Sequence, residues 1–253
     1  MFAAADRNSS AKRDRPRGRG PRPAGGRQEA SSSAYARLRE LVVTGRLAPG
    51  APLIETDLSK RMGMSRTPVR AALQRLQQEG FVASVCVGQM ARAVVAPLTA
   101  EDMREVFVMT GALEATAARL AAALDAEARD TLARDMAAVN VGLREATAAR
   151  PPDLVQAQEL HARFHRTFST AAAGRRLLAE LDVLQPQAER YQRVYTSAMV
   201  FAYEDALEEH DAIIAALRAG DANAAEEAVS RNWRGGAERY RQVVTILGER
   251  GNW

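Results

Sequence analysis

The three histidines of the chain are the residues whose spacing most directly suggests a chemistry. His161 and His165 are four residues apart, which places both imidazoles one turn apart on one face of a helix. His210 lies on a second apolar stripe further along the chain. Neutral imidazole binds zinc and similar divalent ions, and two histidines at this spacing can share one ion. Inward histidines also occur as hydrogen-bonded core residues, so the spacing leaves both a metal site and a metal-free cavity open.

A second group of chemically suggestive side chains lies on the exposed side of a predicted helix that Ser65 begins. Arginine can pair bidentately with guanine in the major groove of DNA, while hydroxyls and free backbone N–H groups at a helix start suit phosphates. The pattern favours a DNA-reading helix, and a solvated charged face is the plainer alternative. The side chains concerned are Ser65, Arg66, Thr67, Arg70 and Gln74.

Hydrophobic periodicity and turn signals predict the elements around this helix. Apolar residues recur at helical spacing over residues 34–45, 55–62 and 65–79, and a glycine closes each segment. Two valine-rich stretches, 81–85 and 92–96, flank a turn at Gly88 and read as a hairpin. Three helices followed by a hairpin predict a winged helix-turn-helix over residues 34–97.

Beyond Pro97 the pattern is helical throughout. A capping-box-like segment at 99–102 begins the first helix, and no strand pattern interrupts the rest of the chain. We therefore predict a mainly α fold: an N-terminal winged helix-turn-helix and a C-terminal all-helical bundle over residues 98–247, which contains the histidines. The further amphipathic segments are 126–149, 153–173, 175–199, 203–219 and 221–247.

Charge divides the chain more clearly than its net value of +4 indicates. Residues 1–33 carry eight basic and three acidic groups, residues 34–98 carry nine and four, and residues 99–253 carry eighteen and twenty-four. A basic region joined to an acidic one predicts that the first meets a polyanion. Arg, Gly, Pro and Ser dominate residues 1–33, which predicts a disordered basic tail able to add non-specific attraction to DNA.

The sequence also indicates where in the cell the protein is expected to be found. No run of about 18 apolar residues is present and the N-terminus lacks the apolar stretch of a secretory signal, so we expect no membrane association and a cytoplasmic location. The single cysteine, Cys86, cannot form an internal disulfide. We expect it to be a small buried side chain.

The N-terminal motifs resemble a known family. The stretches 41–50 (LVVTGRLAPG) and 63–70 (GMSRTPVR), with Leu53, Glu55 and Leu58 between them, are similar to the winged-helix signature of GntR-type bacterial transcription regulators. The resemblance implies dimeric binding to an operator, with contacts from residues 65–67, from Arg70 and from the wing near Gly88. Ala71 departs from the family, which usually has glutamate there.

The second half resembles the helical, FCD-type effector domain of the FadR branch of that family. The similarity is carried by Leu113-Glu114, Phe164-His165, Glu209-His210, Ala216-Leu217 and Gly220-Asp221. Many members bind a divalent metal through an aspartate, the histidine four residues later and two later histidines. The matching positions here are His161, His165, His210 and Asn232, so two of the four depart from the usual set. The resemblance implies zinc or nickel held by three imidazoles, with Asn232 as a weak oxygen ligand.

Thr110 is a further departure, because the family often has an arginine there that pairs with an effector carboxylate. Loss of that guanidinium removes a bidentate anion clamp. The effector is then either less anionic than the organic acids usual in the family, or held by another residue. The candidates for that role are Arg163, Arg190 and Arg193.

Together these features predict a DNA-binding transcription repressor, not an enzyme. It would act as a homodimer on a pseudo-palindromic double-stranded operator, and a small-molecule effector in the helical domain would modulate binding. The alternative is a metal-dependent hydrolase with a nucleic-acid-binding head, in which a three-histidine zinc ion activates water. No His-Glu-x-x-His motif supplies its general base. A third alternative is a nucleoid-type protein that binds DNA without sequence preference through its basic tail.

Overall fold

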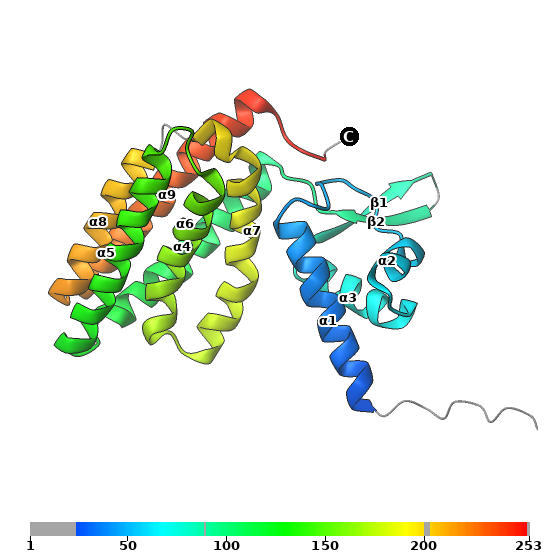
Figure 1. Ribbon diagram of the computed structural model, residues 1–253, viewed down its shortest axis with the longest axis horizontal. Coiled ribbons are helices and arrows are strands. Elements are labelled where there is room, and N and C mark those ends of the chain that lie inside the picture. The colour runs from blue at the N-terminus through cyan, green and yellow to red at the C-terminus, as the bar shows by residue number, and fades with distance from the viewer. Residues whose placement is uncertain (1–23, 89, 200–202, 252–253) are drawn as a thin grey trace, which may run out of the picture.

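The computed structural model of the protein describes residues 24–88, 90–199 and 203–251. In these residues nine helices and one two-stranded sheet form two groups of elements that lie side by side (Figure 1). The winged-helix part comprises α1 (Ala24–Val43), α2 (Glu55–Met62), α3 (Arg66–Gln78), β1 (Val82–Val87) and β2 (Met90–Val95). The predicted mainly α fold class is confirmed.

The winged-helix part has its own apolar core. Leu38 and Val42 of α1 lie in one cluster with Val69 and Leu76 of α3, and Phe81 closes it at the start of the hairpin. These residues recur every three or four positions in each helix, so one stripe of each helix is buried. Strands β1 and β2 pair antiparallel, with Val82 opposite Val95.

Helix α1 corrects the predicted extent of the basic tail. It begins at Ala24, so residues 24–33 are helical and not disordered as expected. Once Ala34 and Leu38 are fixed by packing, each added residue gains a backbone hydrogen bond without a new nucleation cost. The remainder of the predicted tail, residues 1–23, lies outside the described residues.

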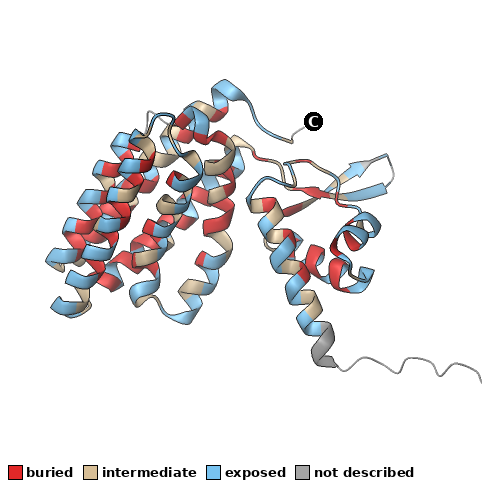
Figure 2. Cartoon of the chain, in the orientation of Figure 1, coloured by how far each residue is buried: buried red, intermediate tan, exposed pale blue. Residues whose placement is uncertain are grey.

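Cys86 is exposed, contrary to the expectation that it is buried. The outer half of the hairpin projects beyond the three helices, and Figure 2 shows its tip as exposed. Because no second layer covers this part of the strands, the usual alternation of buried and exposed residues is lost there.

The helical bundle consists of six helices whose limits lie close to those expected from periodicity. Side chains cap several of them: Thr99 accepts from the backbone N–H of Asp102, and Asp125 accepts from that of Ala128. None of the described helices has the length and apolar character that crossing a bilayer requires. The six are α4 (Ala100–Ala122), α5 (Ala126–Ala148), α6 (Leu154–Ala172), α7 (Arg175–Met199), α8 (Tyr203–Ala219) and α9 (Ala222–Leu247).

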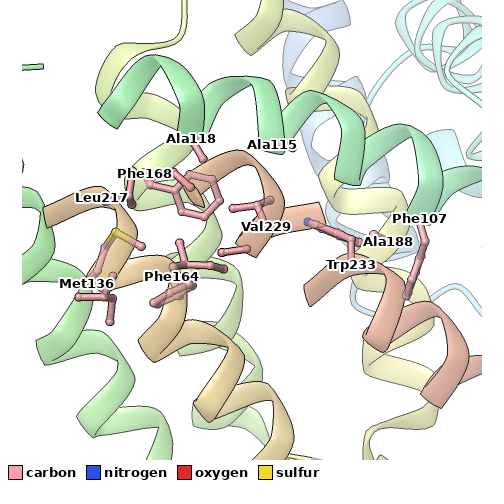
Figure 3. Packing of buried hydrophobic residues seen from close by; sticks show 14 of the residues in the cluster. Phe107, Ala115, Ala118, Met136, Phe164, Phe168, Ala188, Leu217, Val229 and Trp233 are labelled. Atoms are coloured by element: carbon pink, nitrogen blue, oxygen red, sulfur yellow. The ribbon is translucent and has the colours of Figure 1, made fainter. Parts of the chain in front are cut away.

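One large apolar core and a smaller second cluster fill the bundle. Phe164, Phe168 and Leu217 pack in its interior (Figure 3). Helices α4 and α9 approach closely at Gly111, where an added Cβ atom would lie 2.7 Å from Cβ of Trp233. The absence of a side chain at this position therefore sets how near the two helices lie, and both helices carry residues that surround the histidines.

Candidate functional site

The first candidate site is the outer face of α3. Val69, Leu73 and Leu76 are buried against the winged-helix core, which leaves the opposite face of the helix in solvent. Ser65 immediately precedes the helix and is its N-cap residue. The structure places all five predicted DNA-contacting residues of this helix start in exposed positions: Ser65, Arg66, Thr67, Arg70 and Gln74.

Arg70 has a partner that sequence reasoning missed. Its Nε and Nη2 atoms lie 2.9 and 2.8 Å from the carboxylate of Glu55 on α2. The hydrogen bond lowers the pKa of Glu55 and raises that of Arg70. The guanidinium is therefore oriented across the α2–α3 turn, whereas Arg66 lies at the exposed start of α3.

The wing is the other element of this face. Gly88 is exposed and has a φ of +64°, a left-handed conformation that glycine adopts without strain. Arg92 on β2, opposite Val85, is also exposed. The turn predicted at Gly88 is thus the tip of the wing.

The second candidate site is the group of three histidines inside the bundle. His161 and His165 come from α6 and His210 from α8, and their potential ligand atoms all lie within 4.8 Å of one another. His210 is fully buried and His165 is 5% exposed, while His161 is partly exposed at the edge of the group. Residues 45 positions apart in the chain thus converge on a volume that one ion can fill.

Hydrogen bonds orient two of these rings. Nδ1 of His165 lies 2.7 Å from Oε2 of Glu114, and Nδ1 of His210 lies 3.0 Å from Oδ1 of Asn140. Each oxygen can accept a proton from Nδ1, which leaves the lone pair on Nε2. In the described chain the Nε2 atoms of both rings are buried without a hydrogen-bond partner. An unpaired buried polar atom is costly, and metal-binding histidines are held through their other nitrogen in this way, so the residues fit a divalent ion.

Glu114 anchors this arrangement from α4. Its side chain is fully buried, and besides His165 it accepts hydrogen bonds from Nε2 of Gln185 and Nε1 of Trp233, both at 2.7 Å. Three donors around one carboxylate compensate for the loss of its hydration. Burial also lowers the pKa of His210 well below its usual value of 6.5. That imidazole is neutral at neutral pH, as a metal ligand must be.

A small cavity of about 40 Å³ lies beside His161 and His165. The space holds few water-sized groups, so a larger effector requires the surrounding side chains to move. Aromatic and polar side chains line the cavity in similar numbers. The residues that line it include Phe107, His161, His165, Gln192, Tyr203, Asn232, Trp233, Arg239 and Tyr240.

Asn232 and Arg239 of α9 share one partner at this cavity. Nδ2 of Asn232 donates to Oε2 of Glu209 at 2.8 Å, which leaves the amide oxygen as the group available to a ligand. The guanidinium of Arg239 pairs with both oxygens of Glu209, at 2.9 and 2.8 Å. The cavity wall therefore contains an arginine whose charge a carboxylate already balances.

None of the positions considered for effector contact, Thr110, Arg163, Arg190 and Arg193, lines this cavity, so their role stays a prediction. Thr110 is buried and donates to the carbonyl of Val106, whereas Arg163 is exposed. The guanidinium of Arg190 donates to the carbonyl of Ala96, and Nη2 of Arg193 lies 3.9 Å from Oε2 of Glu189. The arginine that lines the cavity is Arg239.

Comparison with known proteins assigns a family to the winged-helix part and to the helical bundle. Residues 30–85 match the profile described as bacterial regulatory proteins of the gntR family, and residues 105–235 match the FCD domain. The chain belongs to the GntR family of bacterial transcription regulators. Its winged-helix part carries the GntR motif, and its helical bundle carries the FCD domain.

Relatives described as transcriptional regulators or repressors match more than half of the chain. An uncharacterized HTH-type transcriptional regulator of Agrobacterium vitis is 33% identical over 56% of this chain and 80% of its own. A probable D-xylose utilization operon transcriptional repressor of Paenarthrobacter nicotinovorans is 30% identical over 76% of this chain and 80% of its own. The solved structure of McbR/YncC from E. coli shares the fold, with a TM-score of 0.67 and 22% identity over 84% of this chain and 98% of its own.

Membership of the GntR family decides between a regulator and a hydrolase. The chain is a transcription regulator and not an enzyme. The hydrolase alternative is therefore wrong, although a group of three histidines is chemically compatible with it.

From the sequence alone, no role is assigned to several polar residues that surround the three histidines. Asn140 and Arg239 belong to helices whose polar residues are numerous, so nothing in the sequence marks them. Glu209 was noted only as part of the motif that carries the family resemblance, and no role was assigned to it. Glu114 was detectable, because it lies on the same helical stripe as Phe107 and Thr110. A carboxylate on an inward apolar stripe signals a buried charge with a partner.

Proposed function

We propose that the protein is a repressor whose operator binding is modulated by a small-molecule effector, and that a divalent metal completes the effector site. The observation that carries the proposal is the pair of buried Nε2 atoms, on His165 and His210, that face the histidine group while their Nδ1 atoms have partners. Zinc and nickel both suit imidazole ligands.

In this proposal His161, His165 and His210 hold the metal, and the amide oxygen of Asn232 is a weaker ligand. Three protein nitrogens leave positions open on the ion, and a bound metal would supply attraction for an oxygen atom of the effector. Arg239 lies in the same cavity wall and is placed to contact the remainder of that molecule.

On the DNA side, Arg66 and Gln74 read base edges in the major groove, while Ser65 and Thr67 contact phosphates. Arg70 joins them in the orientation that Glu55 imposes. The wing tip at Gly88 contacts the adjacent backbone. The support for these roles is exposure on one face together with the GntR motif at residues 30–85.

The repressor acts in this proposal as a homodimer, because one winged helix reaches only one half of a pseudo-palindrome. The surface we assign to the second copy is a groove of about 760 Å³ between α4 and α9. Apolar residues such as Phe107, Val108 and Ala237 line it together with charged residues such as Arg104 and Glu238, and Val108 is 64% exposed. An apolar groove of this kind is a usual place for a partner.

Selection of binding sequences from a random double-stranded DNA pool tests the DNA half of the proposal. We expect one inverted-repeat sequence to be enriched, with an affinity that exceeds non-specific binding at the same salt concentration. Salt-dependent binding without any enriched sequence would contradict it and favour the nucleoid-type alternative.

Elemental analysis tests the metal half, on protein purified without a chelator or an affinity tag. We expect about one divalent ion per chain and a higher melting temperature after addition of zinc or nickel. If neither is found, the histidines line a metal-free effector cavity, and the assignment as a regulator stands without them.

A further inference from the structure

Helix α7 lies between the histidine site and the winged-helix part. In Figure 1 it is the bundle helix that faces α1. Its residues 185–190 contact both sides: Gln185 points to the group around Glu114, and Gln187 and Arg190 point to the winged-helix part. A single rigid element thus has direct hydrogen bonds to the candidate effector site and to the part that carries α3.

The contact of Gln187 is made at the end of the DNA-reading helix. Its Nε2 atom donates to the carbonyl of Glu79, the residue that follows α3, at 2.6 Å. Gly80 comes next with a φ of +80°, and an added Cβ atom there would lie 3.1 Å from the same Nε2. Gln187 is 8% exposed. The carboxamide therefore satisfies a carbonyl at the end of α3 and fits against a position with no side chain.

Pro186 provides a second attachment. Proline has no N–H, so the carbonyl of Asp182, four residues earlier in α7, lacks its helical donor. Arg39 of α1 donates to this carbonyl. Arg190, one turn beyond Pro186, donates to the carbonyl of Ala96 after the wing. Helix α7 is therefore attached to backbone atoms after α3 and after β2, and it receives a side chain from α1.

On its other side α7 reaches the histidines through two hydrogen bonds. Nε2 of Gln185 lies 2.7 Å from Oε1 of Glu114, and Oε2 of Glu114 lies 2.7 Å from Nδ1 of His165. Gln185 and Gln187 are two residues apart in one helix. A shift of Glu114 can therefore reach the end of α3 through two hydrogen bonds and two residues of α7.

We propose that α7 transmits the state of the histidine site to the DNA-reading helix, with Gln187 as the positioning residue. A metal ion on Nε2 of His165 would change the charge near the Glu114 carboxylate. The hydrogen bond that Glu114 accepts from Gln185 would then change in strength or geometry. Because α7 is packed on both sides, a small displacement of α7 alters the hydrogen bond from Gln187 to the carbonyl of Glu79. The backbone conformation at the C-terminal end of α3 changes as a result. The inference rests on the proposed metal site, and coupling of this kind is reciprocal between the two sites.

Hydrogen exchange of the full chain, with and without zinc chloride, tests this inference. In the natural protein we expect zinc to change exchange of the amides over residues 76–82 by about 5-fold or more, the low end of typical coupling between sites. In Gln187→Met, which keeps the shape but lacks the donor, zinc should bind with unchanged affinity while the effect over 76–82 disappears. Glu180→Gln, at an exposed position of α7, is the matched control and should respond as the natural protein does.

A second variant, Gln185→Met, interrupts the same route from the other side and should give the same loss; it also serves if Gln187→Met does not fold. Zinc binding without any change over residues 76–82 would overturn the inference and leave the metal site standing. A normal response in either methionine variant would overturn it as well. Failure of zinc to bind the natural protein would overturn both proposals together.

Discussion

Nδ1 of His165 and Oε2 of Glu114 lie 2.7 Å apart, and both side chains are buried inside the helical bundle. A carboxylate in this position accepts the Nδ1 proton and directs the Nε2 lone pair toward His161 and His210. The orientation of the candidate ligand is thus set by a residue on a different helix.

Replacement of Glu114 by glutamine should weaken zinc binding about 10- to 100-fold, the usual effect of removing such an outer partner. The amide can still accept from Nδ1, but it lacks the charge that strengthens the ligand. Competition titration against a zinc indicator measures the change. Glu226→Gln, which alters a surface pair with Arg119, should leave the affinity unchanged. Equal affinities for natural protein and Glu114→Gln would exclude this role.

Stability of the metal-free protein should fall as the pH drops below about 6.5. Burial lowers the pKa of His210 and of His161 well below 6.5 in the folded chain, so the unfolded chain takes up protons first. The contribution of these two neutral histidines to the free energy of unfolding is complete above the pKa of histidine in the unfolded chain. It is lost as the pH falls toward their lower pKa in the folded chain. Urea unfolding across this range measures it, and the double variant His161→Gln, His210→Gln should show a shallower dependence. An unchanged dependence in that variant would contradict the explanation.

Arg66→Ala should reduce operator affinity by about 1 to 3 kcal/mol if its guanidinium pairs with a base. The fold should persist because the side chain is exposed. Fluorescence titration at fixed salt measures the loss. Arg134→Ala, at an exposed position of α5, is the control for charge alone. The same affinity in both variants would remove Arg66 from the DNA contacts.

Val108→Glu should convert the proposed homodimer into a monomer. Light scattering of the natural protein should give twice the chain mass of 27.4 kDa, and the variant should give that mass once, because an unpaired charge in an apolar interface is costly. Val141→Glu, 56% exposed on α5 outside this groove, should remain dimeric. A dimeric Val108→Glu would place the interface elsewhere.

Gly111→Ala should destabilise the fold by about 1 to 3 kcal/mol, the usual cost of overpacking. The new Cβ would lie 2.7 Å from Cβ of Trp233, an atom next to the backbone that cannot move without shifting α9. Gly236→Ala is the matched control on α9, because nothing lies within 4 Å of its added Cβ. It should be neutral or slightly stabilising, and urea unfolding distinguishes the two. Equal stability of both variants would show that α4 and α9 can separate at no cost.

The sequence by itself determined the local features of this protein. Helix limits followed from apolar periodicity and capping residues, as at α5 and α8, because these depend on hydrogen bonds between near neighbours. The turn at Gly88 followed from glycine and flanking valines. Inward placement of His165 and His210 followed from the same periodicity, since a stripe of apolar neighbours marks the buried face.

Only the tertiary structure decided what those inward residues meet. Glu114 is 51 positions from His165, and Asn140 is 70 positions from His210, so no local pattern pairs them. The presence of Arg239 at the cavity, where Arg163 is absent, depends on how α9 packs against α4, α7 and α8. Periodicity tells whether a side chain faces the core, but the angle and separation of packed helices decide which partners it finds there.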